Sequence, residues 1–111
     1  WEAAHVAANK QLGNLCAVVD WNESGMQLLP QEDMVAKWSA FGWEVHLIDG
    51  HSFAELESVF SKIKFSATGK PKCIVAKTVK GKGVGFIEGH GKWHHRIPDP
   101  KEYSQIMKAL S

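Results

Sequence analysis

The sequence predicts an α/β fold of three layers, in which a parallel sheet is flanked by helices on both faces. Helical patterns and short apolar runs alternate along the chain in the order helix, strand, helix, strand, helix, strand, loop, helix. This alternation is typical of parallel sheets with right-handed crossover connections. The chain has 111 residues, of which 44% are hydrophobic and 23% charged, so we expect one globular domain with a modest core.

The first half of the chain contains two helical patterns and a strand. Residues 1–12 are rich in helix formers and carry small and apolar side chains on one face, with Gly13 as the expected stop. Residues 14–20, NLCAVVD, form a short β-branched apolar run that predicts a buried strand. After a loop with Asn, Ser, Gly and Pro, residues 31–41 show helical spacing, and Gly42 ends the pattern.

A second strand and a third helix follow. Residues 43–49, WEVHLID, alternate apolar and polar side chains before Gly50 and predict the strand. Ser52 is placed to N-cap the next helix, and Glu55 three residues later completes a capping box. The apolar stripe expected on this helix consists of Phe53, Leu56, Val59, Phe60 and Ile63.

The last part of the chain combines a third strand, a long loop and a short helix. Residues 72–78, KCIVAKT, predict the strand, and residues 100–110 predict a helix with proline in its first turn. This helix would present Tyr103, Ile106, Met107 and Leu110 on one face. Residues 79–99 lack a clear periodicity, and a connection of that length in a compact domain is usually functional or disordered. We expect a functional loop.

The charge balance and the cysteines limit the classes of partner and compartment. Because 13 basic residues face 12 acidic ones, the formal net charge of +1 gives no reason to expect nucleic acid or an acidic membrane as partner. No secretory signal and no apolar run of roughly 18 residues is present. Cys16 and Cys73 lie in apolar runs without metal-type spacing, which favours reduced, buried thiols in a cytoplasmic protein over a disulfide.

A ligand site is predicted where the strands end, because parallel sheets bind ligands beyond the carboxyl ends of their strands. The three strand exits, DWNESG, DGHS and KTVKGKG, are all polar and contain glycine. Asn22 follows the first strand, and its side-chain oxygen together with the carbonyl two residues later can hold Mg²⁺ or Ca²⁺ through a bound phosphate. The alternative is that Asn22 makes an Asx-turn and that Asp20 makes an N-cap or loop contact.

The loop after the third strand combines glycines with lysines. The glycines are Gly81, Gly83 and Gly85, and the lysines are Lys77, Lys80 and Lys82. Glycines let the backbone approach a ligand closely, and lysines supply point charges suited to phosphate. The spacing matches neither the phosphate loop of nucleotide-binding proteins nor the dinucleotide fingerprint. The stretch therefore predicts an anion-binding segment, with a flexible solvated loop as the alternative.

The histidines divide into a cluster and three isolated residues. The cluster is His90, His94 and His95. A structural zinc site needs four ligands with recognisable spacing, so a role in hydrogen bonding or proton transfer is favoured over zinc for this cluster. The isolated residues His5, His46 and His51 are interpreted as structural, although His51 lies at a strand exit.

Three segments carry a resemblance to a known family. They read WEAAHVAANKQLGNLCAVVDWNESG, AFGWEVHLIDGHSFAELESVF and KPKCIVAKTVKGKGVGFIEGHGKWHHRIPD. Together they resemble the thiamine diphosphate-binding domain of transketolases, most closely the N-terminal subunit of split transketolases. The likeness runs in register from the first residue to about residue 98, and residues 1–111 then form about half of such a domain.

The resemblance implies roles for four residues. Asn22 would ligate the metal, Mg²⁺ or Ca²⁺, and contact the diphosphate, and the backbone carbonyl of Ser24 would complete the protein ligands. Lys80 would contact the cofactor. His94 would touch both cofactor and substrate and act in catalysis, while His95 stands where the family commonly has glycine. Which of the two histidines faces the substrate therefore stays open.

The implied activity is transfer of a two-carbon ketol unit between sugar phosphates. The family's Gly-Asp-Gly would lie upstream of Trp1, and the chain begins inside a helical pattern without methionine, so we expect an N-terminally truncated piece that is inactive alone. A companion subunit or a homo-oligomer would complete it. The alternatives are a non-catalytic module that self-associates through an uncovered sheet edge or its first helix, and an anion-binding or nucleic-acid-binding remnant.

Overall fold

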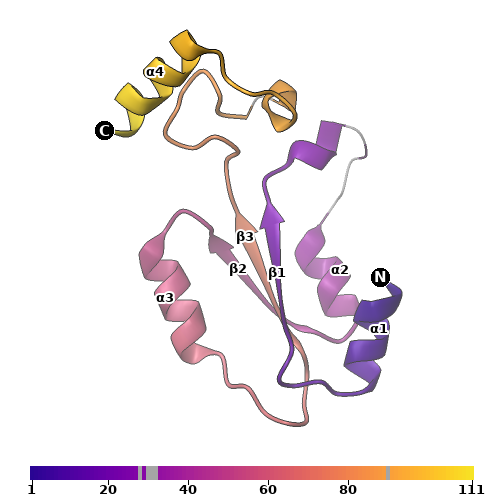
Figure 1. Ribbon diagram of the computed structural model, residues 1–111. Helices are drawn as coiled ribbons and strands as arrows, with labels where there is room; N and C mark the ends of the chain where they lie inside the picture. The colour runs from indigo at the N-terminus through magenta and orange to yellow at the C-terminus, as the bar shows by residue number, and fades with distance from the viewer. Residues whose placement is uncertain (28, 30–32, 90) are drawn as a thin grey trace.

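The computed structural model describes residues 1–27, 29, 33–89 and 91–111. Its sheet has three parallel strands in the order β1-β3-β2 (Figure 1). The strands are β1 (Cys16–Trp21), β2 (Glu44–Asp49) and β3 (Lys72–Lys77), and the helices are α1 (Glu2–Asn9), α2 (Met34–Ala40), α3 (Phe53–Lys62) and α4 (Pro100–Leu110). Two 3₁₀ turns, η1 (Ser24–Gln27) and η2 (Gly91–His94), follow β1 and precede α4. The expected parallel α/β class is confirmed.

The two faces of the sheet have separate cores because side chains alternate along each strand. Cys73 and Val75 of β3 lie in the core beneath α1 and α2. Ile74 and Ala76 point the other way, into the core beneath α3. Figure 1 shows α1 and α2 to the right of the sheet and α3 to its left. Because both its faces are covered, the central strand β3 is buried along almost its whole length, as an unbroken apolar run predicts.

Helix α1 ends earlier than the sequence predicts. The amide of Leu12 donates to the Ala7 carbonyl at 3.1 Å, and the amide of Gln11 donates to the Ala8 carbonyl at 3.0 Å. These two bonds form a Schellman cap, in which the residue after the C-cap takes a left-handed conformation. Gln11 fills that position with φ of 52°, so the helix stops at Asn9 and Gly13 is not its terminator.

The other helices refine the predicted boundaries. Asp33 caps α2 by accepting a hydrogen bond from the Ala36 amide at 2.9 Å, and the predicted start at residues 31–32 lies outside the described residues. Ser52 caps α3 as predicted, accepting from the Glu55 amide at 3.3 Å. The reciprocal half of that capping box is absent, because Glu55 Oε2 instead accepts from the Asp49 amide. The box is therefore wrong for α3.

Helix α3 buries only part of its predicted stripe. Leu56, Val59 and Ile63 pack in the core beneath this helix, whereas Phe53 is 87% exposed and Phe60 is 51% exposed. The two phenylalanines lie outside the contact with the sheet, so counting them as core was wrong. None of the helices in the described part of the chain is long and apolar enough to span a membrane.

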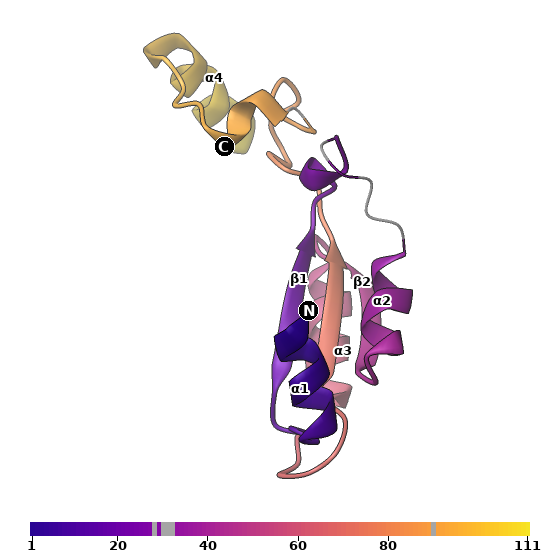
Figure 2. The same ribbon diagram turned by 90° about the vertical axis from the view of Figure 1, so that its right-hand side faces the viewer.

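Residues 79–111 extend beyond the carboxyl ends of the strands and away from the sheet (Figures 1 and 2). The radius of gyration is 17.2 Å, whereas about 13 Å is typical of a compact domain of this length. Helix α4 spans the predicted residues and opens with a complete capping box between Asp99 and Glu102. It contains no buried residue, and the side chains of Tyr103, Met107 and Leu110 are more than half exposed. This extended part therefore adds little to the core.

Candidate functional site

The carboxyl ends of all three strands meet at one rim of the sheet. In the register of the sheet, Lys77 at the end of β3 lies between Trp21 at the end of β1 and Asp49 at the end of β2. The segments after these residues are the three polar exits predicted from the sequence. The amide of Thr78 donates to the Trp21 carbonyl at 3.3 Å, and the amide of Gly50 donates to the Lys77 carbonyl at 2.7 Å. Direct backbone bonds thus join the first exit to the third, and the second to the third.

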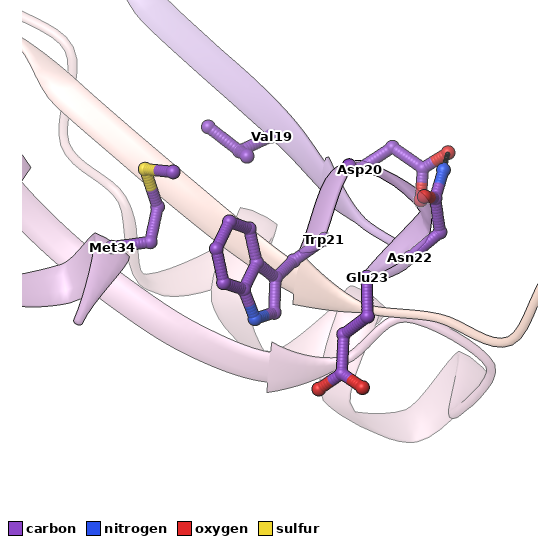
Figure 3. A pocket seen from close by; sticks show the side chains of 7 residues that line it. Val19, Asp20, Trp21, Asn22, Glu23 and Met34 are labelled. Atoms are coloured by element: carbon purple, nitrogen blue, oxygen red, sulfur yellow. Dashed lines mark hydrogen bonds between the residues drawn. The ribbon is translucent and has the colours of Figure 1, made fainter. Parts of the chain in front are cut away.

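The exit of β1 forms a tight polar turn. Asn22 Nδ2 donates to Asp20 Oδ2 at 3.0 Å, and Asn22 Oδ1 accepts from the Ser24 amide at 3.0 Å. The second bond is the Asx-turn considered above for Asn22. Figure 3 shows the Asp20 and Asn22 side chains facing one another, while Trp21 points toward Met34. The Asx-turn leaves one lone pair of the amide oxygen available for a cation, because a carbonyl oxygen has two.

Asp20 also connects the first strand to the third. The hydroxyl of Thr78 donates to Asp20 Oδ1. This bond, together with the one from Asn22 and the positive charge of Lys80, holds the pKa of Asp20 below its ordinary value. Thr78 was not singled out from the sequence. Its signal was the register, because Asp20 pairs with Ala76 and the residue two positions further along β3 lies on the same face.

The loop after β3 folds back on itself. The amide of Gly89 donates to the Lys80 carbonyl at 3.0 Å, which closes the loop at its neck. Gly81 has φ of 76°, and a Cβ atom at this position would lie 2.4 Å from the Ile87 side chain, so only glycine fits there. The predicted lysine–glycine segment is therefore an ordered loop whose turn depends on a glycine.

Lys80 and His94 lie together at the base of this loop. Lys80 Nζ is 3.4 Å from His94 Nδ1. Because an ammonium group has only donors, Nδ1 of His94 must be the acceptor. The ring of His95 stands edge-on to that of His94, with 4.4 Å between centroids, and both side chains are exposed. His90 lies outside the described residues.

A cavity of about 350 Å³ lies between the exit of β1 and the neck of the loop after β3. Its walls are Asn22, Glu23, Ser24, Thr78, Val79, Gly89 and Gly91. The structure therefore brings Asn22 and Ser24 to one wall and places the residues on either side of Lys80 and His94 on the other. The side chains of Lys80 and His94 do not line this cavity. A smaller cavity of about 160 Å³ lies beside Trp21 and Met34 (Figure 3).

The two cysteines are free thiols on opposite faces of the sheet. Cys73 is fully buried, and its burial raises the pKa of the thiol to about 12. Cys16 is only partly buried. The expectation of free thiols is confirmed. Among the described residues, no three His, Cys, Asp or Glu side chains come together as a metal site would require.

The fold and the rim define a parallel α/β domain whose strand exits suit a phosphate-bearing ligand. The family model described as "Transketolase, thiamine diphosphate binding domain" matches residues 1–110. The chain belongs to this family and is a transketolase-type thiamine diphosphate-binding domain.

Named relatives agree with this assignment. One of them is a subunit of the apulose-4-phosphate transketolase of Phocaeicola vulgatus, which is 34% identical over the whole of this chain and is covered to 41%. The 6-deoxy-6-sulfo-D-fructose transketolase subunit SqwG of a Clostridium species is 42% identical over 80% of the chain and is covered to 34%. Human transketolase is 37% identical over 99% of the chain and is covered to 18%. The chain thus spans less than half the length of these relatives.

Solved structures show the same fold. The transketolase of Campylobacter jejuni superposes with a TM-score of 0.80 at 32% identity, covering 97% of this chain and 17% of that protein. The transketolase of Pichia stipitis, solved with a sugar phosphate, superposes with a TM-score of 0.83 at 24% identity, covering 98% of this chain and 17% of that protein. The second likeness concerns the fold alone.

Proposed function

We propose that this chain binds the diphosphate of thiamine diphosphate, together with a divalent cation, as part of a transketolase-type enzyme. The observation that carries the proposal is the cavity between the Asn22–Ser24 turn and the neck of the Lys80 loop. Its two walls come from adjacent parallel strands and meet at the rim where such sheets bind ligands.

The donor set suits a hard cation bridged to phosphate. Asn22 would hold Mg²⁺ or Ca²⁺ through its amide oxygen, and Ser24 through its backbone carbonyl, because both cations prefer oxygen ligands. Mg²⁺ takes six ligands, so the phosphates, water and further groups must supply the others. Asp20 orients the Asn22 amide through the 3.0 Å bond to Nδ2, which directs the oxygen rather than the nitrogen of that amide away from Asp20.

The loop of residues 79–99 would supply the positive charge and the contact to the substrate. Lys80 carries an ammonium group at the mouth of the cavity and would bind the diphosphate as a point charge. His94, 3.4 Å from Lys80, would contact the cofactor and the sugar phosphate substrate, and its unprotonated Nδ1 can accept a proton there. Thiamine diphosphate, when bound, supplies the electron sink for transfer of a two-carbon ketol unit.

Several relatives are named as single subunits of a transketolase, which suggests that this chain needs a companion subunit for activity and is inactive alone. The free thiols support a cytoplasmic location. A self-associating module without catalysis is the second candidate, because Val18 on the unpaired edge of β1 is 60% exposed. An anion-binding or nucleic-acid-binding remnant remains less favoured because the net charge is only +1.

Calorimetric titration with thiamine diphosphate and Mg²⁺ tests the proposal. We expect binding to the native chain that weakens by about tenfold or more in Asn22→Ala, since a metal ligand is removed. Asn14→Ala is the matched control, because Asn14 is an exposed asparagine ahead of the opposite end of β1. No heat with the native chain, or equal loss in both variants, would refute the assignment of the site.

A further inference from the structure

His51 lies at the second strand exit, against the end of β3. Gly50 makes this approach possible, because a Cβ atom there would lie 2.5 Å from the Thr78 side chain and 3.0 Å from the Lys77 carbonyl. Asp49 braces the turn from the other side, with its Oδ1 accepting from the His51 amide at 2.9 Å. The turn thus brings the ring of His51 to the start of the loop after β3.

The ring makes one specific contact with that loop. The backbone amide of Val79 donates to His51 Nε2 at 2.7 Å. Since a backbone N–H can only donate, Nε2 must be unprotonated, and the proton of the neutral ring lies on Nδ1. This bond fixes the peptide between Thr78 and Val79 against the exit of β2, although β2 and the loop are far apart in the sequence.

Val79 is the residue through which this bond reaches the site. It lines the cavity and directly precedes Lys80, whose carbonyl closes the neck of the loop through Gly89. The carbonyl of Val79 accepts from the Lys82 amide at 3.1 Å, so its orientation is passed into the first turn of the loop. Holding the Val79 amide therefore sets the direction in which the Lys80 side chain leaves the backbone.

We propose that His51 is a positioning residue, which holds the Val79 backbone so that Lys80 is directed at the diphosphate of the cofactor. This inference rests on the proposed function for its ligand, but the bond between His51 and Val79 stands on its own geometry. His51 acts through Val79 and has no contact with the cofactor in this account. Loss of its acceptor loosens the neck of the loop and weakens cofactor binding, while the sheet stays intact.

Two variants that differ in reach test the inference. In His51→Gln the side-chain oxygen can take the place of Nε2 and accept from Val79, whereas in His51→Asn it reaches only as far as Nδ1. Both variants keep a polar side chain at an exposed position, so both should fold. Hydrogen exchange of amides in the native chain and in each variant is measured by NMR, followed by titration with thiamine diphosphate and Mg²⁺.

We expect the Val79 amide to exchange about tenfold faster in His51→Asn than in the native chain or in His51→Gln, with the core amide of Val75 unchanged. The affinity for the cofactor should fall about fivefold in His51→Asn, the effect of losing one net hydrogen bond, and recover in His51→Gln. Equal Val79 exchange in all three proteins, or equal affinity in both variants, overturns the inference. If the native chain binds no cofactor, the proposed function fails, while the exchange data still decide whether His51 holds Val79.

Discussion

At the scale of single residues, Asp20 shows how one carboxylate orders a site that two strands share. It accepts hydrogen bonds from Asn22, two residues away, and from Thr78, 58 residues away. The first bond orients the amide proposed to hold the cation, and the second ties that turn to the strand that carries Lys80. A change at Thr78 should therefore be felt on the opposite wall of the cavity.

Replacing Thr78 by Val should raise the pKa of Asp20, because the hydrogen bond from Thr78 is the largest cause of its lowered value. A lowered pKa in the folded state stabilises the protein above the unfolded pKa of about 3.9, and this contribution is lost as the pH falls through the folded value. The native chain should thus exceed Thr78→Val in stability near neutral pH, by less than about 1 kcal/mol since both side chains are partly solvated, and the difference should vanish in acid.

NMR titration of the Asp20 carboxyl carbon in both proteins measures the two pKa values, and urea unfolding in neutral and in acidic buffer measures the stabilities. Ser61→Ala, a change at an exposed position of α3, serves as the control and should leave the Asp20 titration unchanged. An Asp20 titration that is the same in Thr78→Val and the native chain would contradict the hydrogen bond across the rim.

At the scale of elements, the central strand β3 supports both cores. Ile74 is fully buried beneath α3, while its register partner Val18 on the edge strand β1 is 60% exposed. The same kind of side chain on the same face of the sheet therefore has opposite environments, because α3 covers β2 and β3 but not β1. Burial, not residue type, should decide what a truncation costs.

Ile74→Ala should lower the free energy of unfolding by about 2–5 kcal/mol, whereas Val18→Ala should change it by less than about 0.5 kcal/mol. Urea denaturation followed by circular dichroism measures both. Ile74→Val, expected to cost about 0.5–1.5 kcal/mol, keeps the comparison measurable if the larger truncation prevents folding. Equal effects of the alanine changes at positions 74 and 18 would show that the two faces are not covered as described.

The elements themselves followed closely from the sequence, because hydrophobic periodicity and capping residues are local signals. The strands begin and end within one or two residues of the prediction, and α4 matches it fully. The errors arose where distant parts of the chain decide. Glu55 bonds to Asp49 rather than closing its capping box, and Phe53 lies outside the helix–sheet contact. No local pattern reports those tertiary contacts.

The candidate site was predictable in outline for the same reason. Parallel strands must end at one rim, so the proximity of the Asn22 turn and the Lys80 loop followed from the predicted topology. The bonds from Thr78 to Asp20 and from Val79 to His51 did not, because they depend on strand order and register. A sequence gives neither of these directly when only three strands are present.

At the scale of the whole molecule, the described chain leaves apolar surface uncovered in two regions. One is the edge strand β1 with Val18 and the neighbouring Leu15, and the other is the outer side of α1 with Trp1 and Val6. Unpaired edges of sheets invite pairing with another chain, and apolar surface favours association. The chain in isolation should therefore self-associate.

Sedimentation velocity over a wide concentration range should detect dimers or larger species of the native chain. Val18→Lys should shift the equilibrium toward the monomer, because a lysine on an edge strand opposes pairing. Leu47→Lys is the matched control, since Leu47 is 52% exposed on the other edge of the sheet. A native chain that stays monomeric at every concentration would contradict this prediction.

The most direct test of the account is whether one bound cation–diphosphate complex contacts both the β1 exit and the β3 loop. Mn²⁺ accepts the same oxygen ligands as Mg²⁺, and its unpaired electrons broaden the NMR signals of nearby amides. Mn²⁺ added with thiamine diphosphate should broaden the amides of Ser24, Lys80 and Gly89 together and leave Lys70, at the opposite end of the sheet, sharp. Broadening of the Ser24 amide without that of Lys80, or broadening that does not depend on thiamine diphosphate, would contradict the shared site.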